Sequence, residues 1–138
     1  MTMPTLAPPV VSAITAGALI IGQMGLLFAV AGQRRRSQQA LGEGTDPALV
    51  RAVRRHGNYA ENAAVFVVAL ALLEMLGAQR WFVAALAAVF VAGRVAHAIG
   101  MSMPNTVNPF RIGGVFATIG AGLVLGVRLV WLGVGSRG

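Results

Sequence analysis

The sequence predicts an all-α integral membrane protein, a bundle of four transmembrane helices in a single domain over residues 1–138. The first observation is composition, with 57% hydrophobic and only 11% charged residues. A soluble domain carries about 25% charged and about 45–50% apolar residues, and a disordered chain is poorer still in apolar ones. The second observation is that the apolar residues form four long runs. A membrane helix needs about 20 such residues, whereas the strands of a membrane barrel are short and alternating.

The first predicted helix covers residues 10–31 and follows Pro8 and Pro9. It contains no charged residue. A signal peptide is the alternative interpretation, because Ala29-Val30-Ala31 resembles a cleavage site. However, no basic residue precedes the run, and the run is longer than the usual core of about 7–15 residues. A retained transmembrane helix is therefore the preferred interpretation.

The second predicted helix covers residues 47–76 and is the least apolar of the four. Asp46 is a suitable N-cap, and Pro47 suits the first turn of a helix. The uninterrupted apolar core is short, at residues 63–73, and alone would fit a buried helix of a soluble protein. Since it lies between two clear spans, we interpret it as a span with a polar end. Its polar residues include Glu61, Asn62 and Glu74.

The third and fourth helices are predicted over residues 81–101 and 112–134, and a tight hairpin precedes the third. Small residues recur within the spans at helical spacing, which lets helix backbones approach closely. Packing within one bundle explains these stripes, and a subunit interface is the alternative. The stripes comprise Ala18, Gly22 and Gly25 in the first helix, and Gly114, Thr118, Gly122 and Gly126 in the fourth.

The arginines predict the orientation in the membrane. Cytoplasmic loops carry an excess of basic residues. Seven arginines lie between the first two apolar runs or in the third loop, against Arg80 and Arg137 on the opposite side. We therefore expect the loop at 32–46 and the third loop in the cytoplasm, and both termini in the periplasm. The seven are Arg34, Arg35, Arg36, Arg51, Arg54, Arg55 and Arg111.

The same distribution bears on partners and compartment. The net charge of +7 does not indicate a nucleic-acid partner, because the arginines lie at the ends of apolar runs and form no basic helix face. All eleven basic residues are arginine. This usage is typical of a GC-rich genome. The compartment that we expect is the inner membrane of a bacterium.

Ionisable residues within a span are candidates for function. Glu61 and Arg94 lie at similar depth, each about fifteen residues from the hairpin that joins their helices. This predicts an ion pair between them, which would pin the two helices or contribute to a binding site.

Other polar residues surround this pair at the cytoplasmic end. Together they would suit an anionic, hydrogen-bonding ligand, because guanidinium groups bind carboxylates in a bidentate manner. Topogenic arginines and a packing role for His97 are the alternatives. With two histidines and no cysteine, the sequence indicates neither a metal site nor a catalytic triad. The polar set is Arg51, Arg54, Arg55, Asn58, Glu61, Arg94 and His97.

Two motifs resemble a known family. Residues 54–62 read Arg-Arg-His-Gly-Asn-Tyr-Ala-Glu-Asn, which is similar to the His-x-Asn-x-x-Glu-Asn segment of the MAPEG family. These are membrane-associated proteins in eicosanoid and glutathione metabolism, including the microsomal glutathione transferases. Arg94-x-x-His97 resembles the motif on that family's third helix. Length, four helices and a charged first loop extend the resemblance over essentially the whole chain.

The resemblance implies a homotrimer of four-helix protomers that binds glutathione as co-substrate between subunits, near the cytoplasmic side. Arg111 would be catalytic, because the family has an arginine at the start of the fourth helix that stabilises the glutathione thiolate. A cation beside a thiol lowers its pKa. The implied glutathione contacts are Arg54, His56, Asn58 and Glu61, with Arg94 and His97 beside them and Arg51 one turn away.

The leading hypothesis is therefore a membrane glutathione transferase, with peroxidase activity as a further reaction, acting on hydrophobic small molecules that arrive from the membrane lipids. Met101 occupies a place where many members of the family carry a tyrosine. The alternatives are a non-catalytic protein of the same fold that binds lipids or a protein partner, and a small multidrug transporter. Four-helix drug exporters carry a glutamate in the first helix, and this one has no acid there.

Overall fold

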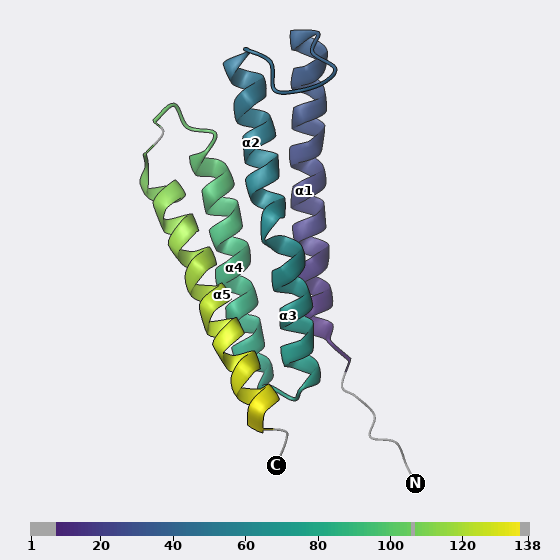
Figure 1. Ribbon diagram of the computed structural model, residues 1–138, viewed down its shortest axis with the longest axis vertical. Coiled ribbons are helices and arrows are strands. Elements are labelled where there is room, and N and C mark those ends of the chain that lie inside the picture. The colour runs from purple at the N-terminus through teal and green to yellow at the C-terminus, as the bar shows by residue number, and fades with distance from the viewer. Residues whose placement is uncertain (1–7, 106, 136–138) are drawn as a thin grey trace.

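The computed structural model describes residues 8–105 and 107–135, which form a bundle of four rods (Figure 1). Four segments are long and apolar enough to cross a membrane, so the predicted fold class of an all-α, four-span bundle is confirmed. The α1–α2 and α4–α5 connections lie at one end, here called the loop end. Arg137 lies outside the described residues. The helices are α1 (Val10–Ser37), α2 (Pro47–Glu61), α3 (Ala63–Met75), α4 (Arg80–Gly100) and α5 (Pro109–Gly135).

Helix α1 continues six residues beyond the predicted end at residue 31 and includes three arginines. Apolarity ends there, but arginine is a good helix former, so loss of apolarity does not end the helix. Gln38 closes α1 in the left-handed conformation, with φ of 55°. Arg34 Nη1 then donates to three carbonyls of the following turn, those of Gln39, Ala40 and Gly42.

The second span is interrupted at Asn62, where the sequence predicts one continuous helix. It begins as predicted, with the Asp46 carboxylate accepting from the Ala48 N–H at 2.9 Å. At the break, the Asn62 N–H bonds to the carbonyl of Ala60. The carbonyl of Asn58, its regular partner four residues back, instead accepts from Arg94 of α4. A side chain inserted into the helix ladder in this way interrupts the helix.

Aromatic side chains fill the core next to this break. The rings of Phe66 and Phe90 stack with centroids 3.7 Å apart and join α3 to α4. Tyr59 is buried against α1, where Gly22 leaves room for its hydroxyl group, because a Cβ on Gly22 would overlap that hydroxyl. The stripe predicted on α1 therefore packs within the protomer at this glycine.

The α4–α5 pair is the tightest contact of the bundle and depends on glycine. A Cβ on Gly114 would lie 2.6 Å from the carbonyl oxygen of Gly93 and 2.8 Å from the Cβ of His97. Thr118, one turn on, is also buried. By contrast, Gly122 and Gly126 have nothing within 4 Å of such a Cβ. The predicted stripe thus packs within the protomer in its first half only.

Gly114→Ala is therefore expected to lower the free energy of unfolding by about 1–3 kcal/mol, because the added methyl group overpacks a contact made by backbone atoms. Thermal or denaturant unfolding in detergent micelles measures it. Gly122→Ala on the same helix is the matched control and should be neutral or stabilising, since alanine has the higher helix propensity. Equal destabilisation by both changes would contradict the assignment of close packing to Gly114.

Candidate functional site

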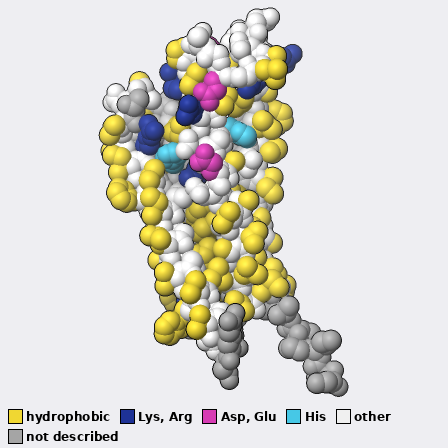
Figure 2. All heavy atoms as spheres, viewed as in Figure 1, with side chains coloured by type: hydrophobic (Ala, Val, Ile, Leu, Met, Phe, Trp, Pro, Cys, Tyr) yellow, Lys and Arg dark blue, Asp and Glu magenta, His cyan; other side chains and the backbone are white. Residues whose placement is uncertain are grey.

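Charged and histidine side chains gather at the loop end, and hydrophobic side chains cover the rest of the face seen in Figure 2. Large hydrophobic residues are exposed on the outward surfaces of every span, among them Ile21, Val65, Trp81 and Phe116. A soluble protein rarely exposes apolar surface so continuously, and a lipid-facing bundle does. The loop end is therefore a polar surface available to water-soluble ligands.

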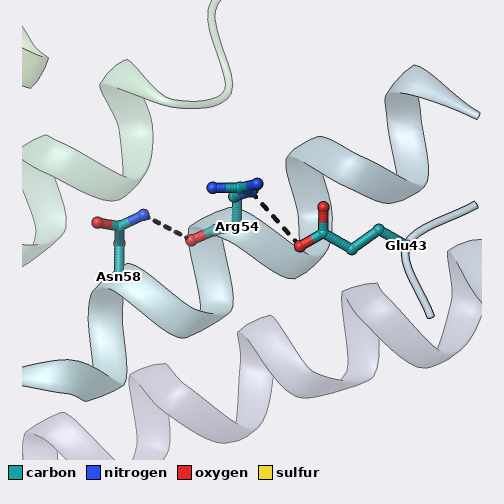
Figure 3. Close-up of polar contacts among 3 residues, drawn as sticks. All are labelled: Glu43, Arg54 and Asn58. Atoms are coloured by element: carbon teal, nitrogen blue, oxygen red, sulfur yellow. Dashed lines mark hydrogen bonds and ion pairs between the residues drawn. The ribbon is translucent and has the colours of Figure 1, made fainter. Parts of the chain in front are cut away.

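Arg54, Asn58 and Glu61 lie on successive turns of α2 and form what we call the α2 strip. Arg54 Nε lies 3.4 Å from the Glu43 carboxylate of the preceding loop, and Asn58 Nδ2 donates to the Arg54 carbonyl at 2.9 Å (Figure 3). Glu61 is exposed, and within the described part of the chain it accepts no hydrogen bond and forms no ion pair. The strip thus presents a cation, an amide and a carboxylate, and these groups have few hydrogen-bond or ion-pair partners within the protein.

The predicted ion pair between Glu61 and Arg94 is wrong as a direct contact, because no such bridge forms in the described residues, although the two charges still attract each other at longer range. Arg94 is 4% exposed, and its Nη2 donates to the carbonyl of Asn58 while its Nη1 lies 3.4 Å from the Thr118 hydroxyl. The guanidinium carbon lies 5.8 Å from the centroid of the Tyr59 ring. Equal depth on two helices does not make two side chains face each other, and Glu61 points outward. Arg94 acts on the strip through the backbone of Asn58.

His97 and Arg111 lie on the other side of the loop end, on the α4–α5 pair. His97 is buried against Gly114. Arg111 lies in the first turn of α5, where its backbone N–H donates to Asn108 Oδ1 at 2.9 Å. The Arg111 side chain lines an apolar hollow of about 370 Å³ with Phe116 and other α5 residues. That hollow includes no residue of the α2 strip.

Asn108 is a site-forming residue that the sequence reasoning missed. It is buried, and its Nδ2 donates to the carbonyls of Gly100 and Asn105, both at 2.9 Å. Together with the bond from Arg111 these contacts fix the start of α5 against the end of α4. The signal was present, because Asn108-Pro109 repeats the cap-then-proline pattern of Asp46-Pro47.

The remaining predicted residues are not brought onto the strip. His56 lies about 160° around α2 from Asn58, at about 100° per residue. Its Nε2 is buried without a hydrogen-bond partner in the described residues. Arg51 and Arg55 line a separate cavity shared with α1 and the end of α4. The set predicted as one polar cluster is therefore divided between two sides of α2.

An apolar groove of about 390 Å³ begins where the α2 strip ends. Asn62, next to Glu61, is its first lining residue, and Thr118 is its other polar one. The rest is hydrophobic or glycine: Val65, Phe66, Ala69, Phe90, Ile119, Gly122, Leu123, Leu125 and Gly126. A polar ligand on the strip and an apolar one in the groove would thus meet near Asn62.

The chemistry that these groups offer is that of guanidinium, amide and carboxylate. Within residues 8–105 and 107–135, no three acidic or histidine side chains gather as a metal site would need. Arginine and asparagine bind carboxylate and amide groups, and a carboxylate binds an ammonium group. The strip can therefore bind carboxylate, amide and ammonium groups.

Comparisons with known proteins identify the family of the chain. The model of the MAPEG family matches residues 12–131. Inner membrane protein YecN of Escherichia coli strain K12 is 31% identical over 121 residues, which are 88% of this chain and 91% of that protein. The protein of the same name from E. coli O6:H1 matches equally well. The chain is a multi-pass membrane protein, and it belongs to the MAPEG family.

Proposed function

We propose that this protein is a membrane-embedded glutathione transferase, which joins the thiolate of glutathione to lipophilic electrophiles. The observation that supports it best is the direct continuity of the α2 strip with the apolar groove at Asn62. A water-soluble thiol peptide would bind on the strip and a membrane-borne electrophile in the groove. Peroxidase activity is a further reaction open to the same thiolate.

Glutathione carries two carboxylates and one ammonium group, and the strip offers a complement to each kind. Arg54 would bind a carboxylate, Asn58 the peptide amides, and Glu61 the ammonium group. Arg54 would have to leave Glu43, but a largely exposed ion pair of this kind contributes only about 0–1 kcal/mol. Glutathione could therefore displace Glu43 from Arg54 at little energetic cost.

Arg111 would supply the cation for the thiolate from a neighbouring subunit. It lies on the outer side of α5, in a hollow that excludes the strip of its own protomer. A homotrimer, in which α5 of one subunit packs beside α2 of the next, would bring the two together. The sulfur would attack the electrophilic carbon, the leaving group would depart with its electron pair, and the thiol proton would pass to solvent.

The arginines support an orientation with the loop end in the cytoplasm and both termini in the periplasm. The relative YecN is named as an inner membrane protein, which supports the bacterial inner membrane as the compartment. Glutathione is a cytosolic thiol, so this orientation places the strip on the side where the substrate is found.

We expect Arg111→Ala to abolish the thiolate absorbance that glutathione produces in purified protein, and to lower conjugation of a small aryl halide by about 100-fold. Losing this cation would leave the thiol protonated, since no other group would stabilise its anion. Glu61→Gln should instead raise the glutathione concentration needed for half saturation while the thiolate signal at saturation remains. Arg128→Ala, on the exposed far part of α5, is the matched control and should change neither.

A folded protein that shows no heat of glutathione binding by calorimetry would contradict this proposal. The second candidate is then a non-catalytic protein of the same fold that binds lipids or a protein partner. The apolar lining of the groove favours it, because only Asn62 and Thr118 there are polar. It predicts binding of a hydrophobic ligand without turnover.

A further inference from the structure

A second cavity opens at the loop end, on a different side of α2 from the strip. It has a volume of about 360 Å³ and lies between α1, α2 and the C-terminal end of α4. Alanine, glycine and methionine form its apolar part, and no acidic residue lines it. Its polar groups are Gln33 and Arg36 of α1, Arg51 and Arg55 of α2, and Ser102. We call it the three-arginine cavity.

The arginines of this cavity have fewer hydrogen-bond and ion-pair partners than the arginines next to them in the sequence. Arg34 donates to three carbonyls, and Arg54 is paired with a carboxylate. Within the described residues, by contrast, Arg36 and Arg51 have no hydrogen-bond or ion-pair partner. Arg36 and Arg51 are exposed to solvent, which screens their charges, and no acidic residue lies among the three arginines. The cavity therefore carries positive charge that no lining side chain compensates.

Arg55 is held in place while one of its donors stays free. Its Nη1 donates to the Ser102 hydroxyl at 2.6 Å, and that hydroxyl donates to the Ala98 carbonyl at 2.9 Å. This chain fixes the guanidinium between α2 and the end of α4. Its Nε is buried and has no hydrogen-bond partner in the part of the chain that the structure describes. A fixed guanidinium with an unused donor is prepared for an acceptor.

We propose that the three-arginine cavity binds a phosphate group. Several guanidinium forks around one space match the tetrahedral oxygens of phosphate. The cavity lies at the end of the apolar spans, the level of lipid headgroups, and its apolar part could hold the first carbons of a lipid. The source is an anionic phospholipid or a soluble phosphate compound. The proposal shares one residue, Arg51, with the proposed glutathione set and otherwise concerns a different side of α2, so its test substitutes only Arg36 and Arg55.

The test measures binding of phosphatidylglycerol and, separately, of inorganic phosphate by the rise in Tm of the purified protein in detergent micelles. Arg36→Gln and Arg55→Gln should each weaken the apparent Kd by about ten-fold or more, because each removes a charge-assisted contact. Arg35→Gln is the matched control. It removes the same charge from the adjacent, exposed residue outside the cavity, and should leave the Kd unchanged.

The two probes identify the source. A response to phosphatidylglycerol but not to inorganic phosphate supports a lipid headgroup, and a response to both or to inorganic phosphate alone supports a soluble phosphate compound. Phosphatidylcholine, which has no net charge, should bind more weakly. Arg55→Lys, which keeps the charge but not the fork, guards against misfolding and should bind with intermediate strength.

Three results would overturn the proposal. One is an equal loss of binding in Arg35→Gln and Arg36→Gln, which would mean diffuse attraction to surface charge. Another is a wild-type protein that responds to neither probe. The third is displacement of the bound probe by glutathione, which would assign the cavity to the thiol substrate.

Discussion

Arg94→Met is expected to raise the free energy of unfolding by about 1–3 kcal/mol, because a buried charge that forms no direct ion pair in the described residues is replaced by an apolar side chain of similar length. The Asn58 carbonyl, released from Arg94, would accept the Asn62 N–H, and α2 and α3 would join into one helix. Denaturant unfolding in micelles measures the first effect, and slower hydrogen exchange of the Asn62 amide measures the second.

The same variant should bind glutathione less well, since the break shapes the end of the α2 strip. Gained stability with lost binding is the behaviour of a residue kept for function. Arg94→Ala is the control for volume, and it should be less stable than Arg94→Met by about 2–4 kcal/mol because it leaves a cavity. If Arg94→Met unfolds more easily than the wild type and exchange at Asn62 is unchanged, Arg94 is a structural pin between helices.

The four spans, and the starts of the first three, could be predicted because they depend on local properties, whereas α5 begins at Pro109, three residues before its predicted start. Apolar run length gives a membrane helix whatever surrounds it. Asp46 before Pro47 gives a helix start because the cap bonds to a residue two positions away. The predicted end of α1 falls too early, because the helix continues through Arg34–Arg36 after its apolar part has ended.

The break at Asn62 could not be predicted, since its cause is on another helix. Nothing in residues 47–76 indicates that the Asn58 carbonyl is taken by a side chain 36 positions away. The predicted polar cluster is divided between two sides of α2 for a similar reason, namely the position of another helix. Arg51, Arg54 and Asn58 lie within about 60° on α2. The position of α1, however, places Arg51 in a cavity and leaves the other two on the open side.

The two acids of the second span show the same limit. Its depth, similar to that of Arg94, makes Glu61 the acid expected to be buried in the span, whereas Glu74 lies near the end of the apolar run. In the structure Glu61 is exposed, and Glu74 is 8% exposed with its carboxylate at the start of α1. Burial of each acid depends on the helices packed against it, and the sequence of α2 and α3 alone does not show which helices these are. The structure therefore reverses the expected order of burial.

Glu74→Ala is expected to lower the free energy of unfolding by about 3–5 kcal/mol, because it leaves two buried donors and one partly buried donor without an acceptor. Its carboxylate accepts from the backbone N–H groups of Val11 and Ser12, both at 2.9 Å, and from the Ser12 hydroxyl at 2.8 Å. The first N–H groups of a helix have no partner within it, and Pro9 provides no side-chain cap for α1. Denaturant unfolding in micelles and hydrogen exchange at residues 11 and 12 provide the measurement.

Glu61→Ala is the matched control, since it removes the same charge from the same span at an exposed position. It should leave stability within about 0.5 kcal/mol of the wild type, as surface changes usually do. Ser12→Ala removes one of the three donors and should cost about 1 kcal/mol. If Glu74→Ala and Glu61→Ala prove equally stable, the carboxylate does not hold α1 against α3. If they differ as expected, the span has one acid that holds the bundle together and another that is free to bind a ligand.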